Sequence, residues 1–309
     1  MKQLVILSGK GGTGKTAVTA ALAHLFSISE NGKDAVLADA DVDAANLELL
    51  VGARRLEEHE FSGGEMASVN EKACIACGIC QDVCRFEAVR YLEARGTFEI
   101  DPLGCEGCGT CFHQCPEEAI RMNPRKSGQW FRSDSRFGPL FHARLRPAQE
   151  NSGKLVALVK ERAREAAMEG NHPLMLVDGP PGIACPAIAA VTGADMVLIV
   201  AEPSLAGLHD LERARDMVAH FRIPAAVCIN KFDLHPEGTR TIQDRCAQRG
   251  EEVLGLIPFD ETVTEALVEG RPISDHDPHG PAGRALAELW EKVRGSLAES
   301  WQESRLISL

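Results

Sequence analysis

Long apolar runs and an excess of positive charge are both missing from this sequence. No uninterrupted apolar segment approaches the roughly 20 residues that a membrane-spanning helix needs. The opening segment Met1–Leu7 is too short and too soon interrupted for a signal peptide. Acidic residues outnumber basic ones by 45 to 33, and the formal net charge is −12. Because nucleic-acid binding needs clustered Lys and Arg, we expect a cytoplasmic protein that neither crosses a membrane nor binds nucleic acid.

Cysteine, in contrast, is abundant and concentrated in one place. Eight of the eleven cysteines lie between Cys74 and Cys115. A secreted disulfide framework is typical of a short chain with an export signal, and neither condition applies to these 309 residues. The pattern therefore favours a reducing compartment and metal ligation.

Short runs rich in Val, Ile and Leu alternate with helical stretches along most of the chain. The apolar runs are typical of buried parallel strands, and they are Leu4–Leu7, Ala35–Ala38, Leu174–Val177, Met196–Val200, Ala226–Ile229 and Val253–Ile257. Helical segments such as Thr16–Ser27 and Gly207–Phe221 lie between them. This alternation predicts an α/β fold with a mostly parallel sheet and helices on both faces.

The alternation breaks in the middle of the chain. Residues 66–123 hold the clustered cysteines, many short turns and no long apolar run. Without this stretch roughly 250 residues are left, the size of one α/β domain. We therefore predict a discontinuous domain formed by residues 1–65 and 124–309, with residues 66–123 as a small inserted α+β module.

A phosphate-binding loop follows the first apolar run. The segment Ser8-Gly9-Lys10-Gly11-Gly12-Thr13-Gly14-Lys15-Thr16 matches G-x-x-x-x-G-K-[ST] between a predicted strand and a predicted helix. Glycines let several N–H groups point at one phosphate chain, and the helix start adds its positive dipole end. Lys15 is expected to reach the β- and γ-phosphates, and the Thr16 hydroxyl to ligate Mg²⁺. The alternative, a glycine-rich turn without a ligand, does not explain the Lys-Thr pair.

The additional lysine of this loop resembles a family signature. The pattern K-G-G-x-G-K-T, which begins at Lys10, is similar to the deviant Walker A motif of the MinD/ParA/Mrp group, to which the nitrogenase iron protein is related. The resemblance implies an ATPase that dimerises around ATP, as a homodimer or with a related ATPase. It also implies that Lys10 reaches the partner's nucleotide and offsets charge during phosphoryl transfer. The alternative for Lys10 is a solvated side chain in a loop.

Acidic residues follow two of the predicted strands. Asp39 and Asp41, with Asn46-Leu47 after them, look like the family's first switch segment. By that match Asp41 orients the attacking water and Asp39 lies nearer the Mg²⁺ shell, although acids in turns are common. Asp178 ends a buried strand before Gly179-Pro180-Pro181-Gly182, which is typical of a Walker B acid that holds a Mg²⁺-bound water. The resemblance makes Gly182 a hinge that responds to the γ-phosphate.

The base-binding residues are less clearly indicated. Asn230-Lys231-Phe232-Asp233 matches N-K-x-D, the guanine-reading motif of GTPases. The resemblance instead implies that Asn230 contacts adenine and that Ile257–Asp260, with Pro258 and Asp260, closes over the base. We therefore expect ATP, while the literal motif leaves GTP as the alternative.

The cysteines form two tandem runs with the spacing 2-2-3, the pattern of bacterial two-cluster ferredoxins, in which the fourth cysteine of each run ligates the other cluster. The expected sets are Cys74, Cys77, Cys80 and Cys115 for one [4Fe–4S] cluster and Cys84, Cys105, Cys108 and Cys111 for the other. Arg85 stands where a proline is usual. Structural zinc is the alternative, but zinc sites rarely show two such runs.

Two further features have open interpretations. Cys185 lies three residues after Gly182, where relatives place cluster ligands near a dimer axis, and its alternative is a structural thiol. The stretch Arg121–Arg146 has seven basic residues against one acid, Asp134, so it is either a docking face or a solvated loop.

The combined motifs resemble a MinD/Mrp-type ATPase with an inserted ferredoxin-like module. We expect nucleotide state to gate electron transfer through the clusters to a partner redox protein. The alternative is an ATP-dependent carrier that delivers Fe–S clusters or metal to a client. A third class, MinD/ParA-like positioning, is disfavoured by the acidic charge and by the absence of a basic amphipathic tail.

Overall fold

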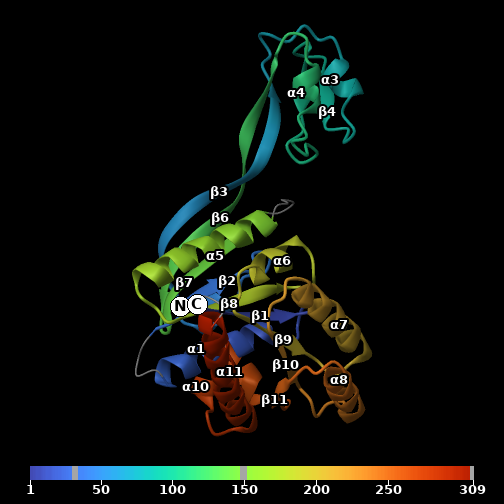
Figure 1. The fold of residues 1–309 in the computed structure, drawn as a ribbon. Coiled ribbons are helices and arrows are strands. Elements are labelled where there is room, and N and C mark those ends of the chain that lie inside the picture. Colours follow the sequence, from blue (N-terminus) through green and yellow to red (C-terminus); the bar gives the residue numbers. More distant parts are fainter. Residues whose placement is uncertain (30–33, 147–151, 307–309) are drawn as a thin grey trace. The chain divides into compact units, whose positions relative to one another are not determined.

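The computed structural model describes residues 1–29, 34–146 and 152–306, and it describes side chains as far as residue 298 (Figure 1). The chain divides into two compact units. The first comprises Met1–His59, Trp130–Arg144 and Ser152–Leu309, and the second comprises Glu60–Gln129 and Leu145–Asn151. The second unit contains the predicted insert, residues 66–123, and extends six residues beyond it on either side.

The described residues form one nine-stranded sheet and one two-stranded sheet. The order of the large sheet is β11-β10-β9-β1-β8-β2-β7-β6-β3. Its strands are β1 (Lys2–Ser8), β2 (Val36–Asp39), β3 (Arg54–Val69), β6 (Ile120–Ser135), β7 (Gly138–Leu145), β8 (Leu174–Pro181), β9 (Met196–Ala201), β10 (Ala225–Asn230) and β11 (Val253–Ile257). From β11 to β7 the neighbouring strands pair in parallel. The predicted α/β fold with a mostly parallel sheet is confirmed.

Helices lie on both faces of this sheet. In the first unit they are α1 (Lys15–Ser29), α2 (Leu47–Leu50), α5 (Ser152–Glu169), α6 (Cys185–Val191), α7 (Leu205–His220), α8 (Pro236–Gln248), α9 (Thr262–Val268), α10 (Ile273–His276) and α11 (Pro281–Leu306). One core cluster joins Leu4 and Ile6 of β1 to the apolar sides of α1 and α11. The alternate residues Val5 and Leu7 are also fully buried, and α6 and α7 contact the same strand.

The burial of the central strands explains why their sequences predicted them well. Every residue of β1, β2 and β9 is buried, so apolar side chains occupy both faces of each strand. Their carboxyl ends meet at one edge of the sheet, where the loops that carry the polar residues begin. None of the described helices has the length and apolar character required to cross a membrane.

Three strands lie outside the six that the apolar runs predicted. β7, β6 and β3 extend the sheet beyond β2. The sequence of β3 contains charged and small residues without regular alternation, and most of its side chains are exposed. Because periodicity marks only strands with a buried face, no signal for β3 was available in the sequence.

The second unit is small and has a core of its own. It contains α3 (Ile79–Asp82) and α4 (Thr110–Gln114), and the antiparallel strands β4 (Val89–Leu92) and β5 (Thr97–Ile100). The apolar core residues are Ala67, Ala88, Val89, Phe98, Ile100 and Ile120, and six of the clustered cysteines belong to this cluster or pack against it. With so few apolar residues, the cysteine side chains form a large part of what this unit buries.

Candidate functional site

The phosphate-binding loop connects the end of β1 to the start of α1. Gly12 and Gly14 adopt left-handed backbone angles, with φ of 81° and 90°, which residues other than glycine adopt at a cost. A Cβ on Gly9 would lie 2.4 Å from the backbone oxygen of Asp210 on α7. The loop therefore needs glycine for its turns and for its close approach to the neighbouring helix.

Five polar side chains converge at the start of α1. The Thr16 hydroxyl donates to Asp178 Oδ2 at 2.7 Å, and the Thr19 hydroxyl donates to Asp178 Oδ1 at 3.0 Å. Lys15 Nζ lies 3.6 Å from carboxylate oxygens of both Asp41 and Asp178. The structure thus brings together Lys15, Thr16, Asp41 and Asp178, which come from three separate segments of the sequence.

Asp39 is fully buried at the end of β2, and its carboxylate binds the backbone of the loop that follows. Its two carboxylate oxygens accept hydrogen bonds from the backbone N–H groups of Asp41, Asn46 and Leu47 at 3.0–3.1 Å. These bonds fix the segment that carries Asp41. Asp39 therefore holds the loop between Asp41 and Leu47 in place. It also lies beside Asp178, its register partner on the adjacent strand β8.

The pKa values of two carboxylates at this site, Asp39 and Asp178, are raised. Burial raises the pKa of Asp39 well above its usual value, and the charge of Asp178 adds to the effect. Burial likewise raises the pKa of Asp178, while Lys15 and the hydroxyls of Thr16 and Thr19 oppose the shift. Clustered oxygen donors with excess negative charge are the environment that a hard divalent cation stabilises. The Thr16 hydroxyl and the Asp178 carboxylate therefore fit the ligand chemistry of Mg²⁺.

Lys10 is held by an acid of its own chain. Lys10 Nζ lies 3.0 Å from Glu202 Oε2, and Lys231 Nζ lies 2.9 Å from Glu202 Oε1. Glu202 follows β9, so it occupies the same edge of the sheet as the loop. Burial alone would raise the pKa of Glu202, but the hydrogen bonds from Lys231 and Lys10 outweigh burial and lower it. One carboxylate thus pairs with two lysines.

The residues expected near the base make contacts within the protein. The Asn230 amide donates to the Thr13 carbonyl at 2.8 Å, which ties β10 to the phosphate loop. Asp233 accepts from the Phe259 N–H at 2.7 Å. Asp260 accepts from the backbone of Thr262 and of Ala282. These bonds fix the loop Ile257–Asp260, with the partly exposed Pro258 in it.

The segment after Asp178 is coupled to the phosphate loop by a backbone bond. Gly182 has a φ of 87°, a left-handed value that suits glycine. Its N–H donates to the carbonyl of Ser8 at 2.9 Å. The segment that carries Gly182 therefore leaves the sheet in direct contact with Ser8, the residue at which the phosphate loop begins.

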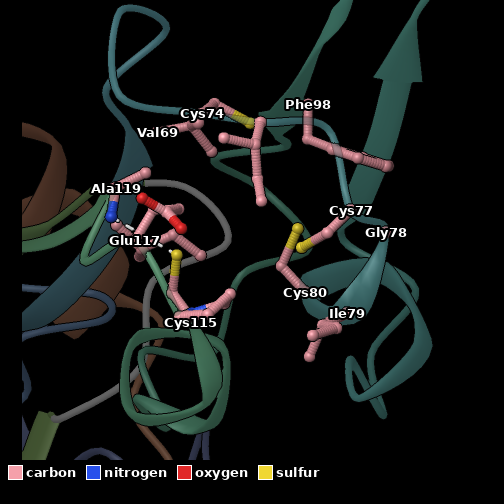
Figure 2. Close-up of a pocket in the computed structure, with 13 residues that line it drawn as sticks. Val69, Cys74, Cys77, Gly78, Ile79, Cys80, Phe98, Cys115, Glu117 and Ala119 are labelled. Carbon is pink, nitrogen blue, oxygen red and sulfur yellow. Dashed lines mark hydrogen bonds between the residues drawn. The ribbon is translucent and has the colours of Figure 1, made fainter.

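The eight clustered cysteines line two separate cavities of the second unit. Cys74, Cys77, Cys80 and Cys115 line one cavity together with Val69 and Phe98 (Figure 2). Cys84, Cys105, Cys108 and Cys111 line the other. Each cavity therefore has three cysteines from one run and the fourth cysteine of the other run, the exchange that the spacing predicts.

The two runs share an unusual backbone. Ala76 and Gly107, Gly78 and Gly109, and Glu87 and Glu118 all have positive φ, and the members of each pair are separated by 31 residues. Gly78 and Gly109 each begin a short helix that contains the third cysteine of its run. The fourth cysteines also match, because Cys84 Sγ accepts from the Ala88 N–H at 3.4 Å and Cys115 Sγ from the Ala119 N–H at 3.3 Å.

These features fit an iron–sulfur donor set. Four cysteine sulfurs per cavity are the ligands of a [4Fe–4S] cluster, and backbone N–H groups directed at sulfur are the contacts that tune one. In the part of the chain that the structure describes, no group of three or more metal-binding side chains is drawn together tightly enough to hold an ion as it stands. The fit therefore rests on the donor chemistry and the duplicated backbone.

The remaining cysteines differ in their surroundings. Cys185 is exposed at the first residue of α6, and a Cβ on Gly153 of α5 would lie 3.3 Å from its Cβ. Cys228 and Cys246 are buried, and burial raises the pKa of Cys228 to about 12. Cys228 is thus a small buried apolar residue.

Most of the basic stretch Arg121–Arg146 pairs within its own chain. Arg132 pairs with Glu57, Arg136 with Asp275, Arg144 with Glu48, and both Lys126 and Arg146 with Glu60. Arg125 donates to the carbonyls of Pro102 and Cys105. These partners anchor most of the stretch to its own chain, and the five side chains in ion pairs remain 40–65% exposed.

Sequence reasoning missed three polar contacts, of which two lie at the site and the third lies between α5 and the end of α6, away from it. Glu202 pairs with Lys10, Thr19 donates to Asp178, and Lys160 on α5 donates to three carbonyls at the end of α6. Glu202 had a signal, because it follows a predicted strand at the carboxyl edge of the sheet. Thr19 and Lys160 lie inside helices, where one polar residue does not stand out.

The family described as the CobQ/CobB/MinD/ParA nucleotide binding domain, CbiA, matches residues 4–273. The chain belongs to this family. The expectation of a MinD/ParA-type P-loop nucleotide-binding ATPase is confirmed at this level.

Relatives and solved structures agree with this membership. An uncharacterised protein of Methanocaldococcus jannaschii, MJ0578, is 33% identical over 292 residues, which cover 94% of this chain and 96% of that protein. The septum site-determining protein MinD of Bacillus subtilis is 24% identical over 300 residues, covering 94% and 88%. The structure of the MinD cell division protein of Aquifex aeolicus is 22% identical, covers 96% and 97% of the two chains, and has a TM-score of 0.58. MinD of Pyrococcus horikoshii, complexed with Mg-ADP, is 18% identical, covers 94% and 95%, and has a TM-score of 0.57.

Proposed function

We propose that this chain is an ATP-hydrolysing iron–sulfur protein in which nucleotide state is coupled to two [4Fe–4S] clusters and gates electron transfer to a partner redox protein. The observation that carries the proposal is the pair of cavities, each lined by four cysteines from both runs. The same chain has the complete phosphate loop of its family. Neither feature alone would suggest coupling.

The residues around Asp178 support phosphoryl transfer. Lys15 is buried with its ammonium between Asp41 and Asp178, where it would exchange carboxylates for the β- and γ-phosphates. Thr16 and Asp178 would hold Mg²⁺, which neutralises phosphate charge when bound. Asp41, on the segment fixed by Asp39, would orient the attacking water. A related MinD has been seen with Mg-ADP, and we assign ATP rather than GTP as the substrate.

Lys10 supports a nucleotide-dependent dimer. Its side chain is about one-third exposed and pairs with Glu202, so Lys10 can exchange the Glu202 carboxylate for another anion without unfolding the loop. We assign that anion to the nucleotide of a second subunit, either a second copy of this chain or a related ATPase. Because the phosphate loop then requires a partner, hydrolysis would depend on association.

The second unit supports cluster binding by its own residues. Cys74, Cys77, Cys80 and Cys115 would hold one cluster, and Cys84, Cys105, Cys108 and Cys111 the other; when bound, these groups supply one-electron transfer. The N–H groups of Ala88 and Ala119 already donate to the two exchanged cysteines. Such bonds stabilise thiolate charge and hold the side chains in place.

Metal analysis tests the proposal directly. Protein purified without oxygen should contain about eight iron atoms and about eight inorganic sulfides per chain, since each [4Fe–4S] cluster carries four of each. Stoichiometric zinc with no iron would show that the cysteine cavities are structural metal sites. For the phosphate loop, Lys15→Ala should abolish ATP hydrolysis, whereas Lys292→Ala, on α11, should leave it intact.

A cluster carrier is the second candidate, and one observation favours it. Cys77 and Cys108, one from each cavity, are exposed, as labile transfer would require. Mixing cluster-loaded protein with an apo client distinguishes the two functions. Iron that stays on this chain while its oxidation state changes supports electron transfer, and iron recovered on the client supports the carrier.

A further inference from the structure

A hollow with several charged side chains in its lining lies in the first unit, at the opposite end of β1 from the phosphate loop. It has a volume of about 450 Å³. Gln3 at the start of β1, Lys160, Glu161 and Arg164 of α5, and Thr192 after α6 line it. The phosphate loop begins only after the far end of β1, so this hollow is separate from the nucleotide site.

Gln3, one of the residues that line the hollow, has an unsatisfied hydrogen-bond donor that is itself buried. Gln3 is only 3% exposed, and its side-chain nitrogen has no hydrogen-bond partner among the residues that the structure describes. Buried amides are almost always paired, and an exception calls for an explanation such as a ligand. Asp195 does not provide the partner, because it accepts from Lys2 Nζ and from the backbone N–H of Gln3.

Two cations one helical turn apart face the same hollow. Lys160 Nζ donates to the carbonyls of Ala189, Ala190 and Thr192 at 2.8, 2.6 and 2.8 Å. Because all three of its N–H groups are used in this way, Lys160 contributes only its positive charge to the hollow. Arg164 has no hydrogen bond or ion pair to any described residue. Its guanidinium therefore has its donors available.

The two cations are not balanced by acids. Burial and, to a smaller extent, the charge of Arg164 together lower the pKa of Lys160 to about 8, with no carboxylate acting in the opposite direction. Glu161, the one acid that lines the hollow in the described chain, is exposed. An anion in the hollow would relieve the repulsion between Lys160 and Arg164.

We propose that this hollow binds a small oxyanion that carries a phosphate group. The guanidinium of Arg164 donates two parallel hydrogen bonds to phosphate oxygens, Lys160 supplies buried positive charge, and the buried amide of Gln3 donates a third hydrogen bond once its side chain turns toward the hollow. The bound anion would connect β1, α5 and the end of α6. The site takes either inorganic phosphate or the phosphate group of a small metabolite.

Calorimetric titration with inorganic phosphate tests the site. The iron-loaded protein is first saturated with Mg·ADP, so that the phosphate loop is occupied, and ionic strength is held constant with chloride. The wild type should bind one phosphate per chain. Arg164→Gln and Gln3→Met should each weaken binding at least about tenfold, because a charge-assisted or buried donor is lost.

Matched variants keep the result interpretable. Arg162→Gln, on the same helix, removes a guanidinium that pairs with Glu165 outside the hollow, and it should not change the affinity. Glu161→Gln removes a repulsive charge at an exposed position and should tighten binding a few-fold. Melting curves establish that each variant is folded.

The choice of ligand distinguishes the sources. Glycerol phosphate that binds more tightly than inorganic phosphate identifies a phosphorylated metabolite, and the reverse order identifies free phosphate; both support the site. Malonate that binds as tightly as phosphate contradicts the phosphate assignment. Absence of phosphate binding in the wild type, or equal affinity in the wild type, Arg164→Gln and Gln3→Met, overturns the proposal.

Discussion

At the scale of single residues, the arrangement around Glu202 connects the phosphate loop to the control of hydrolysis. Glu202 pairs with Lys10 and Lys231 at once. If Lys10 leaves, Lys231 still neutralises the carboxylate, so no unpaired buried charge results. The contact is therefore suited to release Lys10 at a low free-energy cost.

Substitution of Glu202 tests this role. Glu202→Gln keeps the size of the side chain but removes the charge that holds Lys10, so hydrolysis at low protein concentration should rise several-fold if Lys10 acts across a dimer. The measurement is the ATPase rate as a function of protein concentration, with sedimentation as a readout of dimer formation. Glu212→Gln is the control and should leave both unchanged, because Glu212 is a half-buried acid of α7 that pairs with Arg245 of α8 and not with Lys10. A Glu202→Gln profile identical to that of the wild type would show that the contact does not restrain Lys10.

The sequence predicted this site unevenly, for physical reasons. Lys15, Thr16 and Asp178 are fixed by motifs that depend on local strand–loop–helix geometry, and the structure brings them within hydrogen-bonding or ion-pair distance. The use of Asn230 to brace the Thr13 carbonyl and the pairing of Lys10 with Glu202 depend on contacts between segments far apart in sequence. No local pattern contains such information.

At the scale of elements, the left-handed glycines before α3 and α4 organise the cysteine cavities. Gly78 has a φ of 85°, and a Cβ there would come no closer than 4.0 Å to Phe98. Gly78→Ala therefore costs backbone strain alone, about 1–2 kcal/mol. Because Gly78 lies between Cys77 and Cys80, the variant should lose iron as well as stability.

Iron content and melting temperature check this expectation. Gly96→Ala is the matched control, because Gly96 has a φ of 61°, has open space around it and lies in the turn between β4 and β5. It should lower the melting temperature comparably and keep its iron. Equal iron loss in both variants would mean that the effect is general destabilisation.

The contact of buried Lys160 of α5 with the carbonyls at the end of α6 predicts that the stability of the protein depends on pH. Burial lowers the pKa of Lys160 to about 8, whereas the unfolded chain keeps an ordinary lysine pKa. Above about pH 8 the unfolded chain therefore binds more protons than the folded one, and stability gains with rising pH. Relative to Lys160→Met, the wild type should gain about 2 kcal/mol in unfolding free energy between about pH 8 and about pH 9.5.

Denaturant unfolding at a series of pH values measures this difference. Taking the difference from Lys160→Met cancels the titration of other groups. Lys154→Met, at an exposed position of the same helix, should run parallel to the wild type. A constant difference between wild type and Lys160→Met across this range would mean that Lys160 keeps an ordinary pKa in the folded protein.

The elements also show where sequence patterns stop being informative. The runs at β1, β2 and β9 predicted strands because both faces are buried. β3 and β6 have many exposed and charged residues, and their few buried side chains do not follow a regular alternation. The cysteine spacing indicated the exchange between cavities, because ligand geometry, unlike strand pairing, leaves a short-range signature.

At the scale of the whole molecule, one chain joins a P-loop nucleotide-binding domain to a unit with two cysteine-lined cavities. The central claim is that these two parts are energetically coupled. Coupling free energies between sites are typically 1–3 kcal/mol and act equally in both directions. For a one-electron couple, about 1.4 kcal/mol corresponds to a shift of about 59 mV in reduction potential.

A redox titration of the iron-loaded protein, with and without Mg·ATP, tests this claim most directly. ATP should shift the potential of at least one cluster by about 60 mV or more in the wild type, and this shift should disappear in Lys15→Ala. Potentials that are the same with and without ATP, in a wild-type protein shown to bind both iron and nucleotide, would contradict it.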